Sequence, residues 1–200
     1  MANVLVTGGT GVLGRKLVAD LLARGHAVRV LSRRTVPEVP EGATAVTGDL
    51  EADVGLAEAL AGVETVVHSA SDPRQRVDAD VTGTDHLLRA ARAAGEPHVL
   101  YVSIVGCARI PIGYYRAKTV AELAVTESGL PWTVQRTTQF HDLVFALAYA
   151  VSRLPVVPVP RGVRVQPIDV RDLAPRIADL VEAGPAGRAP DLGGPEVHDL

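Results

Sequence analysis

Three side chains in the middle of the sequence have the types and spacing for moving a proton to or from an oxygen atom. Tyr114 and Lys118 are four residues apart, so on a helix they project from the same face. A phenol has an unperturbed pKa of about 10, and a nearby ammonium stabilises its phenolate. Ser103 precedes this pair and carries a hydroxyl that could hold a carbonyl or alcohol oxygen. The three residues predict an acid–base site, with Tyr114 as the acid–base, Lys118 lowering its pKa and Ser103 orienting the substrate oxygen.

The same residue types also occur together without any catalytic role. Tyrosine and lysine at this spacing are common on exposed helices, and a serine at the end of a strand is ordinary. The prediction therefore depends on the surrounding elements. Residues 97–103 are rich in β-formers and predict a central strand that ends at Ser103, and a helix is expected to begin near Tyr114.

A glycine-rich turn near the start of the chain predicts a phosphate site. Residues 4–7 form a short apolar run, after which Gly9, Gly11 and Gly14 satisfy the pattern G-x-G-x-x-G. Glycines let the backbone approach a diphosphate, and the helix that follows offers unpaired N–H groups and the positive end of its dipole. The residues expected to contact a dinucleotide here are Gly8, Thr10, Gly11, Val12, Leu13 and Gly14.

The residues after the second predicted strand, 27–32, indicate which dinucleotide would bind. A site for NAD usually carries an acid at this point, whereas an arginine accommodates the 2′-phosphate of NADP. This chain has Ser32, Arg33 and Arg34 there, which favours NADP; alternatively, the two arginines only solvate a loop. Asp49, followed by Leu50, lies just past the third strand, where it could accept from an adenine amino group, cap a helix starting near Val54, or do both.

Two further strand ends are expected to face the same ligand. Ser69, Ala70 and Ser71 follow the fourth predicted strand, and their small side chains leave room for a cofactor. The histidine before them, His68, is expected to be packed or hydrogen-bonded to solvent rather than catalytic. Thr138 and Gln139 follow the sixth predicted strand and are expected beside the nicotinamide or the substrate.

The C-terminal third is expected to supply a small substrate region, from about residue 137 to 200. Apolar residues between 140 and 149 predict a helix that lines an apolar pocket or, alternatively, belongs to the core or to a homodimer contact. Pro155, Pro158 and Pro160 favour an extended flap over the site. Asp169 is expected to cap a helix from Arg171 to about residue 183, and residues 191–194 suggest one more strand and turn.

Composition limits the class of protein. The chain has 200 residues, 47% of them hydrophobic, and strands alternate with helices, which predicts one α/β domain with a parallel sheet and helices on both faces. A net charge of −3 without a basic cluster argues against nucleic acid and membrane surfaces as partners, and favours a small-molecule substrate. The chain has one cysteine, Cys107, which excludes an intramolecular disulfide and a multi-cysteine metal site, and no metal is expected. No signal peptide or membrane span is expected either. We therefore expect a cytoplasmic protein.

Taken together, the motifs resemble the short-chain dehydrogenase/reductase superfamily, and most closely its atypical, NmrA-like branch of NAD(P)-binding proteins. Four segments carry the resemblance: 7–15, 80–88, 103–106 and 114–118. The resemblance implies a Rossmann-type doubly wound fold that binds NADP, with Ser103, Tyr114 and Lys118 matching the family's catalytic serine, tyrosine and lysine.

Two features depart from the family pattern. Asp80 stands where extended members usually carry an asparagine of a proton relay, and the sequence ends at Leu200, whereas relatives continue past a segment like 193–195. Either the sequence is short or the substrate lobe is minimal. The favoured hypothesis is an NADP-dependent oxidoreductase for a carbonyl or alcohol on a mostly apolar small molecule. The alternative is an NmrA-like redox sensor that binds NADP without turnover; sugar-nucleotide epimerisation or dehydration is disfavoured.

Overall fold

A parallel β-sheet forms the centre of the computed structural model, which describes residues 1–71, 77–153, 162 and 164–199. The sheet has seven strands in the order β3-β2-β1-β4-β5-β6-β8, and every pairing is parallel. The strands are β1 (Asn3–Thr7), β2 (Ala27–Ser32), β3 (Thr44–Thr47), β4 (Thr65–His68), β5 (His98–Ile104), β6 (Trp132–Thr137) and β8 (Gly187–Arg188). The order of strands reverses between β1 and β4, which makes the carboxyl ends of these two strands the topological switch point.

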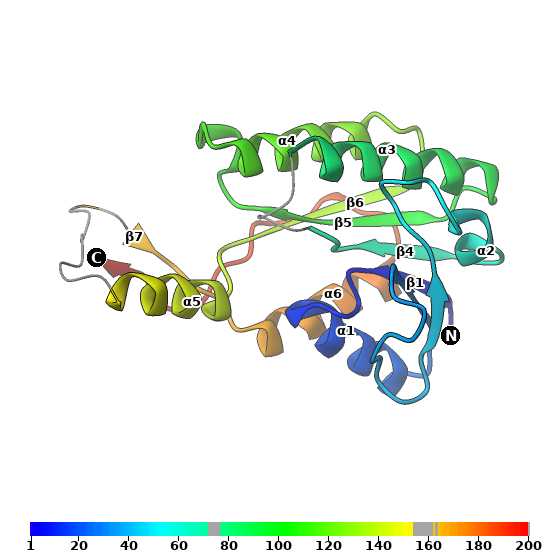
Figure 1. The fold of residues 1–200 in the computed structure, drawn as a ribbon, viewed down its shortest axis with the longest axis horizontal. Coiled ribbons are helices and arrows are strands. Elements are labelled where there is room, and N and C mark those ends of the chain that lie inside the picture. The colour runs from blue at the N-terminus through cyan, green and yellow to red at the C-terminus, as the bar shows by residue number, and fades with distance from the viewer. Residues whose placement is uncertain (72–76, 154–161, 163, 200) are drawn as a thin grey trace.

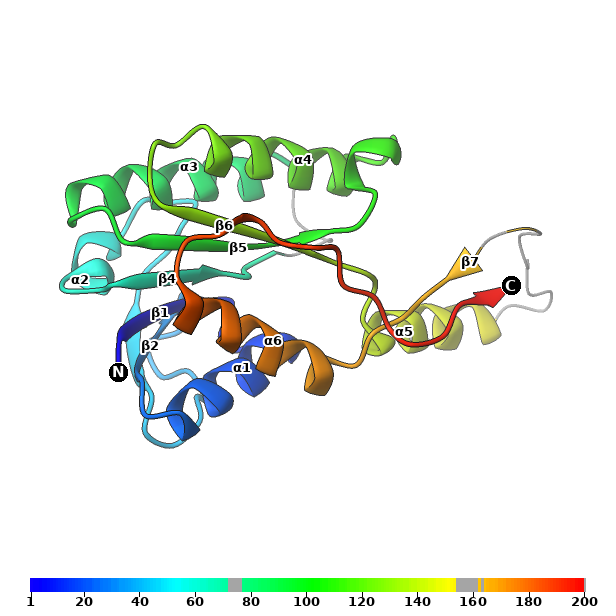
Figure 2. The same ribbon diagram turned by 180° about the vertical axis from the view of Figure 1, so that it is seen from behind.

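Helices cover both faces of the sheet, as the alternating pattern predicted. Figures 1 and 2 show α1 (Val12–Ala23) and α6 (Val170–Ala183) together on one face. The other face carries α3 (Val77–Ala93) and α4 (Gly113–Thr126), with the short α2 (Leu56–Leu60) beside them. Each pair of long helices buries its own hydrophobic cluster against the sheet, so the predicted Rossmann-type, doubly wound α/β fold is confirmed.

Local sequence explains where the helices begin and which side they bury. In α1 the apolar residues recur at helical spacing and are buried, including Leu13, Leu17 and Leu21. At the start of α6 the Asp169 carboxylate accepts a hydrogen bond from the backbone N–H of Arg171 at 2.8 Å, so the predicted N-cap is confirmed. These two helices are therefore fixed against the sheet by features that are readable from the chain.

Two local predictions were wrong. Asp49 does not cap the helix after it, because α2 begins at Leu56 and its N-cap is Gly55; the Asp49 carboxylate instead accepts from the backbone N–H of Glu51 at 2.8 Å. Residues 191–194 do not form a strand of their own, since only Leu192 makes an isolated bridge to β6, and the last strand of the sheet lies earlier, at β8.

The C-terminal side of the molecule extends away from the sheet. Figure 1 shows α5 (His141–Ser152) projecting from the body beside a two-stranded antiparallel ribbon of β7 (Arg164–Val165) and β9 (His198–Asp199). On α5, Phe145 is 73% exposed, so this helix is not part of the core. The predicted proline flap, Pro155 to Pro160, lies outside the described residues. Among the helices that are described, none is long and apolar enough to cross a bilayer.

Candidate active site

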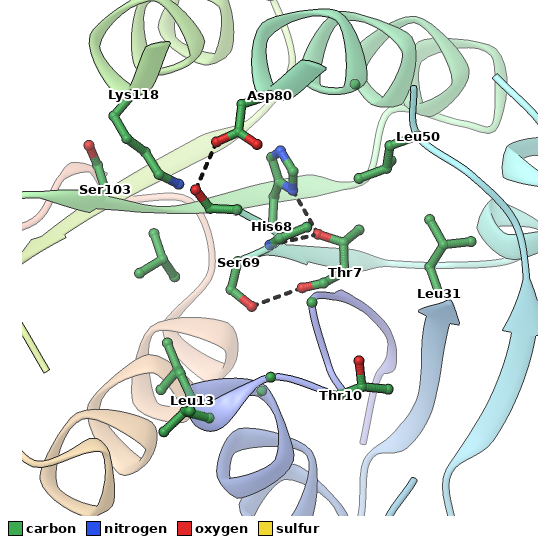
Figure 3. Close-up of a pocket in the computed structure, with 18 of the residues that line it drawn as sticks. Thr7, Thr10, Leu13, Leu31, Leu50, His68, Ser69, Asp80, Ser103 and Lys118 are labelled. Carbon is green, nitrogen blue, oxygen red and sulfur yellow. Dashed lines mark hydrogen bonds between the residues drawn. The ribbon is translucent and has the colours of Figure 1, made fainter. Parts of the chain in front are cut away.

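One cavity opens at the carboxyl ends of the parallel strands, where the switch point lies. Its volume is about 580 Å³, which is within the range of small-molecule sites. All the residues that the sequence predicted for cofactor binding or catalysis line this cavity, several of them drawn in Figure 3. They are Gly8, Thr10, Gly11, Val12, Leu13, Gly14, Ser32, Arg33, Arg34, Asp49, Leu50, Ser69, Ala70, Ser71, Ser103, Tyr114, Lys118, Thr138 and Gln139.

A side chain would be tolerated differently at each of three glycines in the first turn. Gly8 has φ of +75°, and a Cβ there would lie 2.7 Å from the backbone nitrogen of Ala70. A Cβ on Gly14 would lie 2.1 Å from the Gly8 carbonyl oxygen, so α1 packs directly on the turn. Gly11 is exposed, and a Cβ there would meet only that same oxygen, at 3.1 Å. Gly8 and Gly14 are therefore required by the fold, whereas Gly11 leaves open space at the start of the helix.

The start of α1 fits the diphosphate of a dinucleotide. The first N–H groups of a helix have no intrahelical acceptor, and the N-cap Gly11 provides no side chain to satisfy them. Across the cavity, the hydroxyl oxygen of Thr138 is buried and has no hydrogen-bond partner among the described residues. Unpaired donors with the positive end of a helix dipole suit an anion, so the start of α1 would hold the phosphates of a bound dinucleotide.

At the other end of the cavity, the exposed side chains of Arg33 and Arg34 follow the buried Ser32 at the end of β2. The Ser32 hydroxyl accepts from the backbone N–H of Arg34 at 3.2 Å, which fixes this turn. The Asp49 carboxylate, which binds the backbone of its own turn, lines the same end of the cavity. Two guanidinium groups therefore stand at the rim of the cavity beyond the second strand.

Lys118 is a buried side chain that lines the cavity. Only 3% of it is exposed, and its Nζ lies 4.9 Å from the centroid of the Tyr101 ring. Burial lowers the pKa of Lys118 to about 8, while the nearby Asp80 acts in the opposite direction. Figure 3 shows the Lys118 amine and the Asp80 carboxylate pointing into the same space. The ammonium is therefore held at a pKa close to neutral beside the face of α4 that carries Tyr114.

A serine joins Tyr114 to Asp80. The Ser71 Oγ lies 3.2 Å from the phenol oxygen of Tyr114 and 2.8 Å from Oδ2 of Asp80. The sequence placed Ser71 only in the cofactor site and treated Asp80 only as a departure from a family pattern. No local signal predicted their contact, because Ser71 is 43 residues from Tyr114 along the chain.

His68 is buried behind this group and is fully paired, as the sequence predicted for a packed histidine. Its Nδ1 is 2.7 Å from the Thr7 hydroxyl, and its Nε2 is 3.0 Å from that of Thr84. The Thr84 hydroxyl donates to the backbone carbonyl of Asp80, so its oxygen is left to accept from Nε2–H of His68. Burial, together with Lys118, lowers the pKa of His68 to about 3, which keeps the ring neutral.

The Ser103 hydroxyl is directed at a carboxylate and not at Lys118. It is fully buried and donates to Oε2 of Glu122 at 2.7 Å, and Figure 3 shows it turned away from the Lys118 amine. Glu122 also receives the guanidinium of Arg136 at 2.6 Å. In this conformation the hydroxyl is engaged with Glu122, although Ser103 was expected to face the substrate. Glu122 was not predicted, but its position, four residues after Lys118, was a usable signal.

The buried Lys118 should make stability depend on pH in an unusual direction. Its pKa is about 8 in the folded state and 10.5 in the reference state, so between these values the unfolded chain binds more protons, and stability rises as pH increases. A shift of this size corresponds to about 3 kcal/mol. We expect Lys118→Met to be more stable than the parent at pH 7 and to lose most of that advantage by pH 10.

Urea unfolding of both proteins at several pH values, without added dinucleotide, measures this difference. The matched control is Lys16→Met, because the Lys16 side chain is 41% exposed and pairs with Asp20 on the surface. A Lys118→Met protein that is less stable than the parent at pH 7 would contradict the expected cost of burying this ammonium.

The sheet order and the glycine turn at its switch point define a Rossmann-type, dinucleotide-binding α/β protein. The model of the NAD(P)H-binding family matches residues 8–174, and the chain belongs to this family. The predicted family is thereby confirmed.

Relatives with names agree with this assignment. The chain is 35% identical over 205 residues to (4-alkanoyl-5-oxo-2,5-dihydrofuran-3-yl)methyl phosphate reductase of Streptomyces griseus, covering 96% of this chain and 68% of the relative. It is also 35% identical over 181 residues to sterol demethylase protein B of Methylococcus capsulatus, covering 84% of this chain and 53% of that relative. The chain thus spans about two thirds of the length of the reductase and about half of the length of sterol demethylase protein B.

A solved structure agrees as well. UDP-glucose 4-epimerase of Thermus thermophilus in complex with NAD superposes with a TM-score of 0.78 at 25% identity, covering 98% of this chain and 79% of the epimerase. A nicotinamide dinucleotide is therefore supported as the ligand class.

Proposed function

We propose that this protein is an NADP-dependent oxidoreductase that acts on a carbonyl or alcohol of a mostly apolar small molecule. The observation that carries the proposal is the meeting of Tyr114 and Lys118 with the glycine turn in one cavity. A bound NADP supplies or accepts the hydride. The phenol of Tyr114 gives a proton to the substrate oxygen in reduction and removes it in oxidation.

Lys118 supports this proton transfer electrostatically. Because the side chain is buried, its positive charge acts through a medium of low polarity and stabilises the Tyr114 phenolate more strongly than an exposed lysine would. A hydroxyl that already lies within hydrogen-bond distance of the Tyr114 phenol belongs to Ser71. Ser103, if it is to orient substrate, must first turn away from Glu122.

The substrate side of the cavity supports an apolar ligand. Four apolar side chains line the cavity beyond the catalytic groups. Two lie on β5, one just before α5 and one on α5: Val102, Ile104, Phe140 and Leu143. The relative named a reductase acts, as its name states, on a (4-alkanoyl-5-oxo-2,5-dihydrofuran-3-yl)methyl phosphate. An apolar pocket would suit the alkanoyl part of such a molecule, although not its phosphate.

NADPH consumption against a panel of ketones, aldehydes, enones and quinones, with chains of increasing length, tests the proposal. We expect at least one compound to be reduced at a rate that depends on Tyr114. If NADPH binds but no compound gives such a rate, the enzyme hypothesis fails and the redox sensor becomes the better explanation.

Cofactor choice depends on the two arginines after β2. Arg33→Ala should weaken NADPH binding by about 10- to 100-fold, because charge-assisted hydrogen bonds contribute about 1.5–3 kcal/mol, and should leave NADH affinity nearly unchanged. Fluorescence titration with both dinucleotides measures the two values. Arg176→Ala is the control, since Arg176 lies on α6 and its 66% exposed side chain pairs with Asp179. Equal losses for NADPH and NADH would contradict a 2′-phosphate site.

A further inference from the structure

We propose that Ser71 and Asp80 form the proton route between Tyr114 and solvent, an inference that rests on the proposed oxidoreductase function. The three side chains come from different elements: Ser71 follows β4, Asp80 lies on α3 and Tyr114 lies on α4. Their oxygen atoms are in series, 3.2 Å from Tyr114 to Ser71 and 2.8 Å from Ser71 to Asp80. Figure 3 marks the second of these contacts by a dashed line at Asp80.

The serine hydroxyl has one proton and two neighbours that can accept it. When Ser71 donates to Asp80, its oxygen can accept the phenol proton of Tyr114; when it donates to Tyr114, it stabilises the phenolate. Rotation of one hydroxyl therefore connects the two states that an acid–base catalyst alternates between. An aspartate at the far end can take up or release a proton, which the amide of an asparagine cannot do in this way.

In alcohol oxidation the substrate carbon gives its hydrogen and an electron pair to NADP⁺, and the substrate hydroxyl gives its proton to the Tyr114 phenolate. Tyr114 then passes a proton to Ser71 while Ser71 passes its own to the Asp80 carboxylate. Asp80 is partly exposed and releases the proton to water. Carbonyl reduction uses the same steps in reverse, with the proton entering through Asp80 and the hydride coming from NADPH.

The surrounding groups leave few other routes for this proton among the described residues. His68, behind the site on β4, has both ring nitrogens paired and a pKa of about 3. Tyr101 on β5 is buried, and its surroundings raise its pKa well above 10. Lys118 on α4 lies over the Tyr101 ring and contributes charge. These three side chains are buried, whereas the Asp80 carboxylate is partly exposed to solvent.

Steady-state kinetics on the full chain with saturating NADPH test the route, using Ser71→Ala, Asp80→Asn and the hydroxyl-retaining Ser71→Thr. We expect Ser71→Ala and Asp80→Asn to lower kcat by about tenfold or more, and Ser71→Thr to recover most of the loss. Imidazole added as a proton carrier should raise the rate of Ser71→Ala and not that of the parent, which a purely structural defect would not show. Thr126→Ala, which removes a hydroxyl from the far end of α4, is the control for helix effects.

Failure of the route and failure of the proposed function give different results. If the parent is active and Ser71→Ala keeps kcat within about twofold without buffer dependence, the route is wrong and the oxidoreductase stands. If no substrate is ever turned over, NMR of the protein with ¹³Cζ-labelled tyrosine decides. Asp80→Asn should then lower the pKa of Tyr114 because it removes a neighbouring negative charge, and Ser71→Ala should also shift that titration. A Tyr114 titration unchanged in both variants overturns the connection.

Discussion

Tyr114→Phe is expected to lower kcat by about 10²- to 10⁴-fold, the range that loss of a general acid–base group produces. The change removes one oxygen atom and keeps the ring, so the packing of Tyr114 against the Tyr115 ring should be preserved. NADPH should still bind, because the glycine turn and the arginine rim are untouched. Single-turnover measurements with excess enzyme then separate the loss of chemistry from any change in substrate binding.

The comparison of Tyr114→Phe with Tyr115→Phe makes this prediction specific. Both side chains line the cavity and both are tyrosines on the same helical turn, but it is Tyr114 that contacts Ser71 and stands four residues before Lys118. We expect Tyr115→Phe to keep kcat within about threefold of the parent. Similar losses in the two variants would mean that Tyr114 has no special role, and the enzyme hypothesis would lose its main support.

Gly14→Ala is expected to lower the stability of the fold substantially. A Cβ at this position would lie 2.1 Å from the Gly8 carbonyl oxygen and 2.6 Å from Cα of Gly9, both of which are backbone atoms. In a helix, alanine raises the free energy of unfolding by about 1 kcal/mol relative to glycine. Overpacking against a backbone that cannot move lowers it by about 3 kcal/mol. The clash therefore dominates, and α1 must move away from the turn.

The net loss of about 2 kcal/mol should lower Tm by about 4–8 °C for a chain of this length, and thermal unfolding measures it. Gly11→Ala is the matched comparison, because its φ of −79° suits any residue and its Cβ would meet a single atom. We expect Gly11→Ala to unfold close to the parent temperature and yet to bind NADPH at least about tenfold more weakly, since its methyl group occupies the space of the diphosphate. If Gly14→Ala is as stable as Gly11→Ala, the close packing of α1 on the turn is not what fixes this glycine.

The sequence alone predicted the fold and which residues line the cavity. Parallel strands all end at the same edge of a sheet, so residues that follow successive strands must meet there, whatever the details of packing. This reasoning brought together the glycine turn, Arg33 after β2, Ser69 after β4 and Thr138 after β6, and all of them line the cavity. The i, i+4 spacing likewise placed Tyr114 and Lys118 on one face of α4.

Only the tertiary structure decided where the side chains of this group point and which partners they have. The Ser103 hydroxyl donates to Glu122 at 2.7 Å, so its direction depends on the position of α4 relative to β5. The contacts of Ser71 with Tyr114 and Asp80 depend on the packing of three elements that are distant in sequence. The local periodicity of a sequence predicts which side chains share one face of a helix or strand, because the backbone repeat sets this face. It does not predict how two elements are aligned with each other, because the packing of the whole core sets that alignment.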